Sequence, residues 1–381
     1  MATPRRTRPL RSFSFVASGA RTDVVVGPGA LASLVARLPS IAPGRWFLIS
    51  SKKIFNLHGP KLFAGGVEGV LSKKPLFVPD GEAAKTWSVL GRLLEGLVRR
   101  GLRRDGGIVA LGGGTVGDVA GFAAALALRG VPVVQAPTTL LAASDSALGG
   151  KTAVDLPSGK NLAGAFHPPR LVVVDTSTLE TLPPRAYRSG LAEVVKSSML
   201  DAGFHRAMAR LQAPLSAREP AAVAEAVRRS LGVKARAVAR DAFERTGERA
   251  SLNLGHTVGH ALETASGGRL EHGEAVAWGL LAALELSVTR ANLPRRTAEA
   301  LAGRVVRLVR APRPAAAAVR GVSALLLADK KADRLGLRAV VLARPGRAVL
   351  VRAEAAEILE AFAGVLARYN SVGWVSPGFR G

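Results

Sequence analysis

Residues 108–118 read IVALGGGTVGD, four apolar residues followed by three glycines and a short polar stretch. Such a run is typical of a buried strand that ends in a tight glycine turn before a helix. It also satisfies the pattern G-x-G-x-x-G, in which N–H groups at a helix N-terminus can bind a pyrophosphate. The acidic residue expected about 20 residues later is missing. The stretch therefore predicts a βα unit, and a turn without a ligand remains an alternative to a nucleotide site.

Comparable apolar runs lie on both sides of this stretch. Residues 23–26, 46–49, 133–136 and 171–174 are each followed by Gly, Ser, Pro or Asp, and residues 87–99 have helical spacing. Short buried strands that alternate with helices are typical of a parallel sheet covered by helices. The first half of the chain is therefore predicted to be an α/β nucleotide-binding domain with a largely parallel sheet.

After about residue 185 the sequence becomes rich in Ala, Leu, Arg and Glu at helical spacing. Helices are predicted at residues 191–199, 221–239, 258–265, 275–289, 297–309 and 355–369, with a hairpin of residues 338–342 and 348–351. The alanine run 315–318, beside Pro312 and Pro314, is interpreted as a linker. Because proline resists helix continuation, Pro183-Pro184 marks the expected domain boundary. We expect a basic tail at 1–12, an α/β domain at 13–185, a mainly α-helical metal-binding domain at 186–370 and a tail at 371–381.

Composition excludes several classes of protein. The chain has 381 residues and no cysteine, so disulfide scaffolds, iron–sulfur clusters and thiol nucleophiles are excluded, and any metal must be bound by His and carboxylates. The absence of cysteine also favours a cytoplasmic protein. No membrane partner is expected, since no apolar run approaches the roughly 18 residues of a membrane helix. The net charge of +25 would suit nucleic-acid binding. The arginines are scattered without a binding motif, however, so nucleic acid is not the expected partner.

Three of the six histidines lie within a short stretch, at His256, His260 and His272. Residues at i and i+4 share a helix face, so His256 and His260 have the spacing of two ligands of one divalent metal. Glu193 lies on an earlier helix with Lys196 at i+3, which alone is only an ion pair. A His/His/Glu set would suit zinc with an open position for substrate. A surface helix that carries two histidines remains the alternative.

Lysines follow glycine turns or lie within apolar helices. They occur in Gly150-Lys151, Gly159-Lys160, Val195-Lys196, at Lys234 and in Lys330-Lys331. A compact ammonium in such a place can bind phosphate or carboxylate. Any one of these lysines could be a solvated surface residue, but the group favours a pocket for an anionic substrate.

Together these motifs resemble the 3-dehydroquinate synthases, a family of the sugar-phosphate cyclases, over about residues 23–345. The matching runs are residues 112–122, Arg129-Gly130, residues 137–142, Asp145-Ser146, residues 149–152, 159–161, 192–196, 272–276 and 329–331, and Arg249-x-x-x-Asn253-x-x-His256-Thr257-x-Gly259-His260.

The resemblance implies a role for each matched residue. Glu193, His256 and His272 would bind Zn²⁺ or Co²⁺, and His260 would act on the substrate instead. Residues expected to bind NAD are Glu82, Lys85, Gly113, Gly114, Asp118, Thr138, Thr139, Lys151, Lys160 and Thr181. Residues expected to contact the substrate are Asp145, Lys151, Lys160, Asn161, Lys196, Lys234, Arg249 and Asn253, and one or both of Lys330 and Lys331 would close the site. Arg129 would reach across the interface of a homodimer.

The resemblance also implies the reaction. The substrate of the family, 3-deoxy-D-arabino-heptulosonate 7-phosphate, is converted to 3-dehydroquinate and phosphate in the shikimate pathway, which supplies chorismate and aromatic amino acids. NAD oxidises the sugar transiently, phosphate is eliminated, the hydride returns, and an aldol step closes the ring, so this lyase causes no net redox change. Related cyclases that make deoxy-inosose or valiolone, and metal-dependent polyol dehydrogenases, are the alternatives.

Three features depart from the family pattern. Ser51-Lys52-Lys53 stand where an acid often binds the adenosine ribose, which leaves NADP open as the nucleotide. Lys234 is one residue farther from Arg249 than expected, which indicates an insertion at residues 241–247. Asp155 replaces a common Asn.

Overall fold

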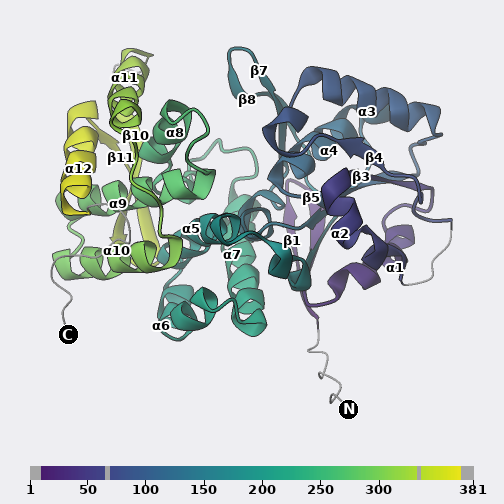
Figure 1. Cartoon of the computed structure of the whole chain (residues 1–381), viewed down its shortest axis with the longest axis horizontal. Coiled ribbons are helices and arrows are strands. Elements are labelled where there is room, and N and C mark those ends of the chain that lie inside the picture. Colours follow the sequence, from purple (N-terminus) through teal and green to yellow (C-terminus); the bar gives the residue numbers. More distant parts are fainter. Residues whose placement is uncertain (1–9, 65–68, 333–335, 370–381) are drawn as a thin grey trace. The chain divides into compact units, whose positions relative to one another are not determined.

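The structure is a computed structural model that describes residues 10–64, 69–332 and 336–369 (Figure 1). Its backbone contacts divide the chain into two compact units. The first contains Met1–Leu182 and Val223–Phe243, and the second contains Pro183–Ala222 and Glu244–Gly381. The chain first passes from one unit to the other at Pro183, close to the predicted boundary. A single boundary near residue 185 does not describe the return of Val223–Phe243 to the first unit.

The first unit is built on a seven-stranded sheet in the order β1-β2-β9-β6-β5-β3-β4. Within this sheet, β1 and β2 pair in antiparallel fashion and the other described pairs are parallel, so the prediction of an α/β domain with a largely parallel sheet is confirmed. The five predicted strands correspond to β2 (Ala20–Gly27), β3 (Trp46–Ser51), β5 (Gly107–Gly112), β6 (Val133–Pro137) and β9 (Leu171–Asp175).

Two edge strands, β1 (Arg11–Ala17) and β4 (Leu76–Val78), are additional. Arg11 and Ser12 were expected in the basic tail, but they pair with Val26 and Val25 of β2. The alternation of β1 between exposed and partly buried side chains explains why its sequence lacks an apolar run. Residues 1–9 and 370–381, which include the rest of both expected tails, lie outside the described residues.

The central strands are buried on both faces because helices cover each side. Successive side chains of a strand point to opposite faces. Phe47 and Ile49 of β3 therefore pack in one core with α3 (Trp87–Arg99) and α4 (Gly114–Leu126). Trp46 and Leu48 pack in the other core with α1 (Leu34–Arg37) and α2 (Lys52–Phe63). Burial on both faces explains why these strands read as continuous apolar runs.

A separate hairpin of β7 (Lys151–Leu156) and β8 (Gly159–Phe166) belongs to the first unit, and Figure 1 shows it projecting from the ribbon. Short 3₁₀ and π turns connect the larger elements: η1 (Ala30–Ser33), η2 (Leu38–Ser40), η3 (Gly81–Ala84), η4 (Ala127–Arg129), η5 (Ala142–Ser146) and η6 (Thr176–Thr181). Helix α7 (Pro220–Arg240) contributes its residues from Val223 onward to this unit.

The second unit is mainly helical, as predicted. It contains α5 (Pro184–Leu200), α6 (Ala202–Ser216), η7 (Arg249–Asn253), α8 (His256–Ala265), α9 (His272–Arg290), α10 (Arg295–Val309), α11 (Ala316–Ala332), α12 (Ala355–Arg368) and the hairpin of β10 (Leu337–Arg344) and β11 (Arg347–Ala353). Helix α9 contacts α5, α8, α10, α12 and β10. A helix that is apolar on nearly all sides is buried in this way.

Two helices of the second unit were not predicted. Helix α6 was not recognised, and the interpretation of the alanine run 315–318 as a linker is wrong, because Ala316 begins α11. The physical reason is that alanine has the most favourable helix propensity of all residues, so a helix begins once Pro314 has been passed. None of the described helices is both long enough and apolar enough to cross a membrane.

Candidate active site

Three helices of the second unit bring one potential metal-binding group together. Glu193 comes from α5, His256 from the start of α8 and His272 from the start of α9. One ligand atom of each residue lies within 4.8 Å of the others, as a single ion would require. These are the three residues that the sequence resemblance assigned to the metal.

In both histidines of this group, Nε2 is the ring nitrogen that faces Glu193. The Nδ1 atom of His256 lies 3.2 Å from the carbonyl oxygen of Leu254, and the Nδ1 atom of His272 lies 2.8 Å from the carboxylate of Glu263. A proton on each Nδ1 would satisfy these acceptors and leave Nε2 with a free lone pair. The two Nε2 atoms each lie 3.7 Å from Oε1 of Glu193.

The electrostatics of the group suit a cation. Glu193 is only 1% exposed, and neither carboxylate oxygen accepts a hydrogen bond, although Lys196 forms an ion pair with it. Burial favours protonation of Glu193, yet Lys196 and the two histidines hold its pKa well below the usual value. Burial and Lys196 lower the pKa of His256 to about 3, which keeps this ring neutral. A buried carboxylate and a neutral imidazole are a donor set that fits Zn²⁺ or Co²⁺.

His272 behaves differently from His256 in the metal-free protein. Burial would lower its pKa, but the carboxylates of Glu193 and Glu263 raise it to about 9. A metal ion would replace the proton on Nε2, since both need the same lone pair.

Close glycine contacts hold the three helices together beside the ligands. A Cβ atom on Gly273 would lie 1.9 Å from the carbonyl oxygen of Ser189, one turn before Glu193. A Cβ atom on Gly279 would lie 1.9 Å from the carbonyl oxygen of Gly255, which precedes His256. The chain therefore needs glycine where α9 approaches α5 and α8, and this approach sets the distances between the ligands.

His260 lies beside the metal-binding group without belonging to it. Its ring centroid is 4.9 Å from that of His256 and 6.0 Å from that of His272. Spacing of i and i+4 alone would have made His260 a ligand, whereas the group formed in space takes His272. Partial burial, with His272 and Lys196 nearby, lowers the pKa of His260.

The other expected substrate residues of the second unit differ in exposure. Lys196 and Arg249 are almost completely buried, and Arg249 lies 3.5 Å from Glu244. Asn253 is exposed at the end of η7, directly before α8. Lys330 and Lys331 belong to the end of α11, and their side chains lie outside the part of the chain that the structure describes.

In the first unit, the glycine turn meets the loop after the next strand. Gly113 caps α4 at the end of β5, and Thr138 and Thr139 follow the adjacent parallel strand β6. A Cβ atom on Gly113 would lie 3.1 Å from Thr139, and one on Gly114 would lie 3.0 Å from Oγ of Ser146. The buried hydroxyls of Thr138 and Ser146 have no hydrogen-bond partner. Unpartnered hydroxyls beside a positive helix N-terminus fit the pyrophosphate of a nucleotide.

Lys85 links the expected nucleotide and substrate residues. Its buried ammonium lies 2.9 Å from Asp118 Oδ2 and also contacts Asn161 Oδ1. Burial raises the pKa of Asp118 despite this ammonium. Asn161 has a left-handed backbone (φ 58°), and its N–H donates to Asp155 at 2.7 Å. Asp155 thus holds the turn that brings Asn161 to Lys85.

A second ion pair joins α7 to η5. Lys234 Nζ lies 2.8 Å from Asp145 Oδ1 and 2.9 Å from the carbonyl oxygen of the same residue. The return of Val223–Phe243 to the first unit therefore brings Lys234 to a residue expected to contact the substrate.

The remaining expected residues of the first unit are exposed: Glu82, Arg129, Lys151, Lys160 and Thr181. Thr181 Oγ1 lies 3.1 Å from Nε2 of His58. Sequence reasoning missed His58 and Glu263, and it quoted Ser146 in a matching run without giving it a role. Glu263 lies seven residues after His256 and so on the same face of α8, which is a signal that helical spacing could have provided.

Comparisons with known proteins agree with this arrangement. Family models described as the N-terminal and C-terminal parts of 3-dehydroquinate synthase match residues 75–189 and 190–332. A 3-dehydroquinate synthase of Xanthomonas oryzae pv. oryzae is 46% identical over 310 residues, 77% of this chain and 82% of the relative.

Two solved structures at 26% identity share the fold. One is 2-deoxy-scyllo-inosose synthase complexed with carbaglucose-6-phosphate, NAD⁺ and Co²⁺ (TM-score 0.80, 93% of this chain and 99% of the other). The other is the 2-epi-5-epi-valiolone synthase ValA from Streptomyces hygroscopicus subsp. jinggangensis with NAD⁺ and Zn²⁺ bound (TM-score 0.80, 95% and 99%). Fold and site thus define a protein of the sugar-phosphate cyclase class. Within that class, the chain belongs to the 3-dehydroquinate synthase family.

Proposed function

We propose that this protein converts 3-deoxy-D-arabino-heptulosonate 7-phosphate to 3-dehydroquinate and inorganic phosphate. The observation that carries the proposal is the grouping of Glu193, His256 and His272 in a chain whose family models cover residues 75–332. Bound NAD would accept and return a hydride, and Zn²⁺ or Co²⁺ on the three ligands would stabilise a substrate alkoxide.

The cationic residues of the site suit an anionic substrate. Lys196 and Arg249 are buried and hold their charges in surroundings of low dielectric, where each charge interacts strongly with a bound anion. The substrate carries a carboxylate and a phosphate, and such charges orient it for reaction. Within the first unit, the ammonium of Lys234 pairs with Asp145, a residue that is also expected to contact the substrate.

His260 is the residue best suited to move a proton. Because its pKa is lowered, a ring nitrogen of His260 is free to accept a proton near pH 7. Its ring lies beside the rings of His256 and His272, but His260 does not belong to the metal-binding group.

The nucleotide would bind to the first unit. The N-terminus of α4 at Gly113 and Gly114 would receive the pyrophosphate, with Thr138, Thr139 and Ser146 as hydroxyl donors. Lys52 and Lys53, the exposed first residues of α2, stand where an acid often binds the adenosine ribose in the family. Direct titration with NAD and with NADP would show which nucleotide the protein prefers.

A related cyclase activity is the second candidate. It is less favoured, because the inosose and valiolone synthases are 26% identical to this chain, whereas the Xanthomonas 3-dehydroquinate synthase is 46% identical. A homodimer with Arg129 at the interface and a cytoplasmic location also belong to the proposal. Sedimentation of the wild type and of Arg129→Ala, and cell fractionation, would test them.

The decisive experiment measures phosphate and dehydroquinate release from the heptulosonate phosphate, with NAD and zinc. We expect activity that a chelator removes and added metal restores, and that Glu193→Ala lacks. Glu193→Gln, which keeps the size of the side chain, separates loss of charge from loss of packing. Phosphate release without dehydroquinate would indicate a related cyclase, and no turnover by the metal-loaded protein would refute the proposal.

A further inference from the structure

The two histidine ligands are held in different ways. The side chain of His256 is 11% exposed, and its Nδ1 faces the backbone carbonyl of Leu254, two residues earlier in the chain. The side chain of His272 is 30% exposed, so packing restrains it less. Its Nδ1 faces a side chain instead, the carboxylate of Glu263 at 2.8 Å.

This contact joins two helices at the metal-binding group. Glu263 lies two turns along α8 from His256, and His272 is the first residue of α9. A carboxylate that accepts the Nδ1 proton of a histidine fixes the ring orientation and leaves Nε2 as the metal-binding atom. Its negative charge also makes the imidazole a stronger ligand.

We infer that Glu263 is a positioning residue that holds His272 as an Nε2 ligand and thereby sets the metal affinity of the site. The inference rests on the proposed function to the extent that a metal binds there. It assigns no contact between Glu263 and the metal or the substrate. Loss of the carboxylate frees the His272 ring to rotate and leaves its Nδ1 without an acceptor.

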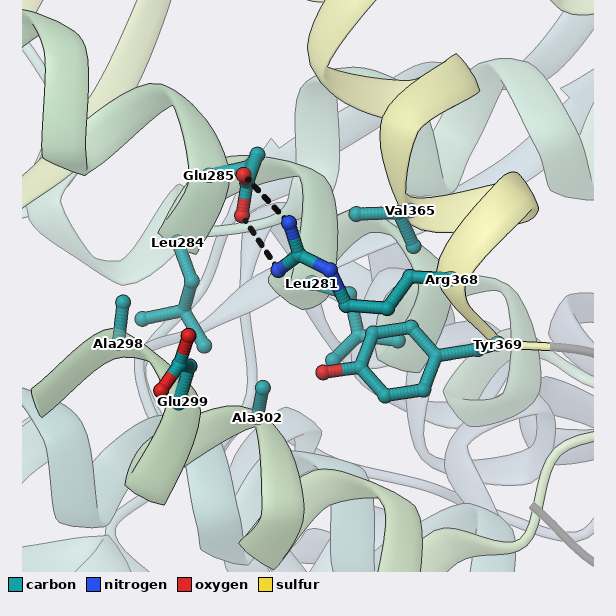
Figure 2. A pocket seen from close by; sticks show the side chains of 9 residues that line it. All are labelled: Leu281, Leu284, Glu285, Ala298, Glu299, Ala302, Val365, Arg368 and Tyr369. Carbon is teal, nitrogen blue, oxygen red and sulfur yellow. Dashed lines mark hydrogen bonds and ion pairs between the residues drawn. The ribbon is translucent and has the colours of Figure 1, made fainter. Parts of the chain in front are cut away.

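Glu285 offers a matched control in the same unit. Its side chain is 19% exposed against 18% for Glu263, and it forms ion pairs with Arg295 and Arg368. Figure 2 shows Glu285 and Arg368 facing each other beside Tyr369, in a pocket formed by α9, α10 and α12. Glu285→Ala therefore removes a mostly buried carboxylate and its ion pairs without touching a metal ligand.

The test compares metal binding by the wild type, Glu263→Ala, Glu263→Gln and Glu285→Ala. Zn²⁺ and Co²⁺ affinities are measured by competition with a chromophoric chelator, and the ring nitrogen of His272 that carries the proton is identified by ¹⁵N NMR of the zinc-loaded protein. We expect Glu263→Ala to bind about 10–100-fold more weakly and to lose its Nδ1–H tautomer. Glu263→Gln should lose less affinity, because its amide oxygen still accepts from Nδ1. The visible spectrum of bound Co²⁺ should change in Glu263→Ala and stay unchanged in Glu285→Ala.

Two outcomes would overturn the inference. One is wild-type metal affinity in Glu263→Ala. The other is an equal loss in Glu285→Ala, which would show that general destabilisation causes the effect. If the wild type itself bound neither metal, the metal site of the proposed function would fail first, so the two failures can be distinguished.

Discussion

Lys85 is a buried cation whose ammonium lies between Asp118 and Asn161 in the first unit. Breaking a fully buried ion pair costs about 3–5 kcal/mol, because the remaining charge is left uncompensated. The Asp118 side chain is 23% exposed, so water offsets part of that cost. We expect Lys85→Met to lower the free energy of unfolding by about 1–3 kcal/mol and to weaken NAD binding. Urea denaturation and calorimetric NAD titration measure the two effects. The double variant with Asp118→Asn should recover part of the stability, and an additive double variant would argue against the pair.

His58 is a residue whose protonation opposes folding. Burial and the neighbouring Lys61 lower its pKa below the usual 6.5. Below that pH the unfolded chain binds a proton that the native protein does not, so the unfolding free energy falls as the pH falls through 6.5. We expect His58→Gln to reduce this fall between pH 7 and pH 5, as measured by urea denaturation at each pH. An unchanged pH dependence would show that His58 titrates alike in both states.

Gly273 governs how helices α5 and α9 approach each other. We expect Gly273→Ala to lower the unfolding free energy by about 1–3 kcal/mol or more, since its Cβ would overlap the Ser189 carbonyl. Metal affinity should fall as well, because the overlap displaces His272 from Glu193. Gly364 of α12 has no atom near its Cβ position, so Gly364→Ala should stabilise the protein by about 0.5–1 kcal/mol. Thermal unfolding and metal titration of both variants test the prediction, which fails if the two variants behave alike.

Elements buried on both faces were the most predictable from sequence. Strands such as β5 and β9 read as continuous apolar runs because helices cover both sides of the sheet. The β7–β8 hairpin was missed, because most of β8 is exposed and its sequence has no apolar run. Helix α11 was missed because Pro312 and Pro314, next to the alanine run, favoured a linker over a helix.

The site was predictable in its residue types but not in its pairings. Helical spacing alone favoured His260 as a ligand, whereas the family resemblance assigned His272. The folded arrangement of α8 and α9 brings His272 to the group. The contacts of Lys85 with Asp118 and of Lys234 with Asp145 join residues 33 and 89 positions apart. Spacing along one element carries no information about such contacts, since they depend on how distant elements pack.

The whole chain carries a net charge of +25, which affects the molecule beyond any one site. Excess charge of one sign destabilises a compact state through self-repulsion, and salt screens that repulsion over about 10 Å at ~0.1 M. We therefore expect the temperature of unfolding to rise when NaCl is increased from ~0.01 M to ~0.15 M. A lower temperature of unfolding at the higher salt concentration would mean that attractive ion pairs, such as Arg185 with Glu274, contribute more than the net repulsion.

The same charge predicts how the protein behaves toward nucleic acid. Scattered arginines bind phosphates without sequence preference, so the logarithm of DNA affinity should fall linearly with the logarithm of salt concentration. We expect binding at low salt to be lost near ~0.2 M salt, while the Zn²⁺ affinity of the site changes little, because Glu193 and His256 are buried away from the salt. Fluorescence anisotropy with a short DNA duplex and chelator competition, at matched salt concentrations, measure both. DNA binding that persisted at high salt would point to a dedicated surface and would make nucleic acid a partner in its own right.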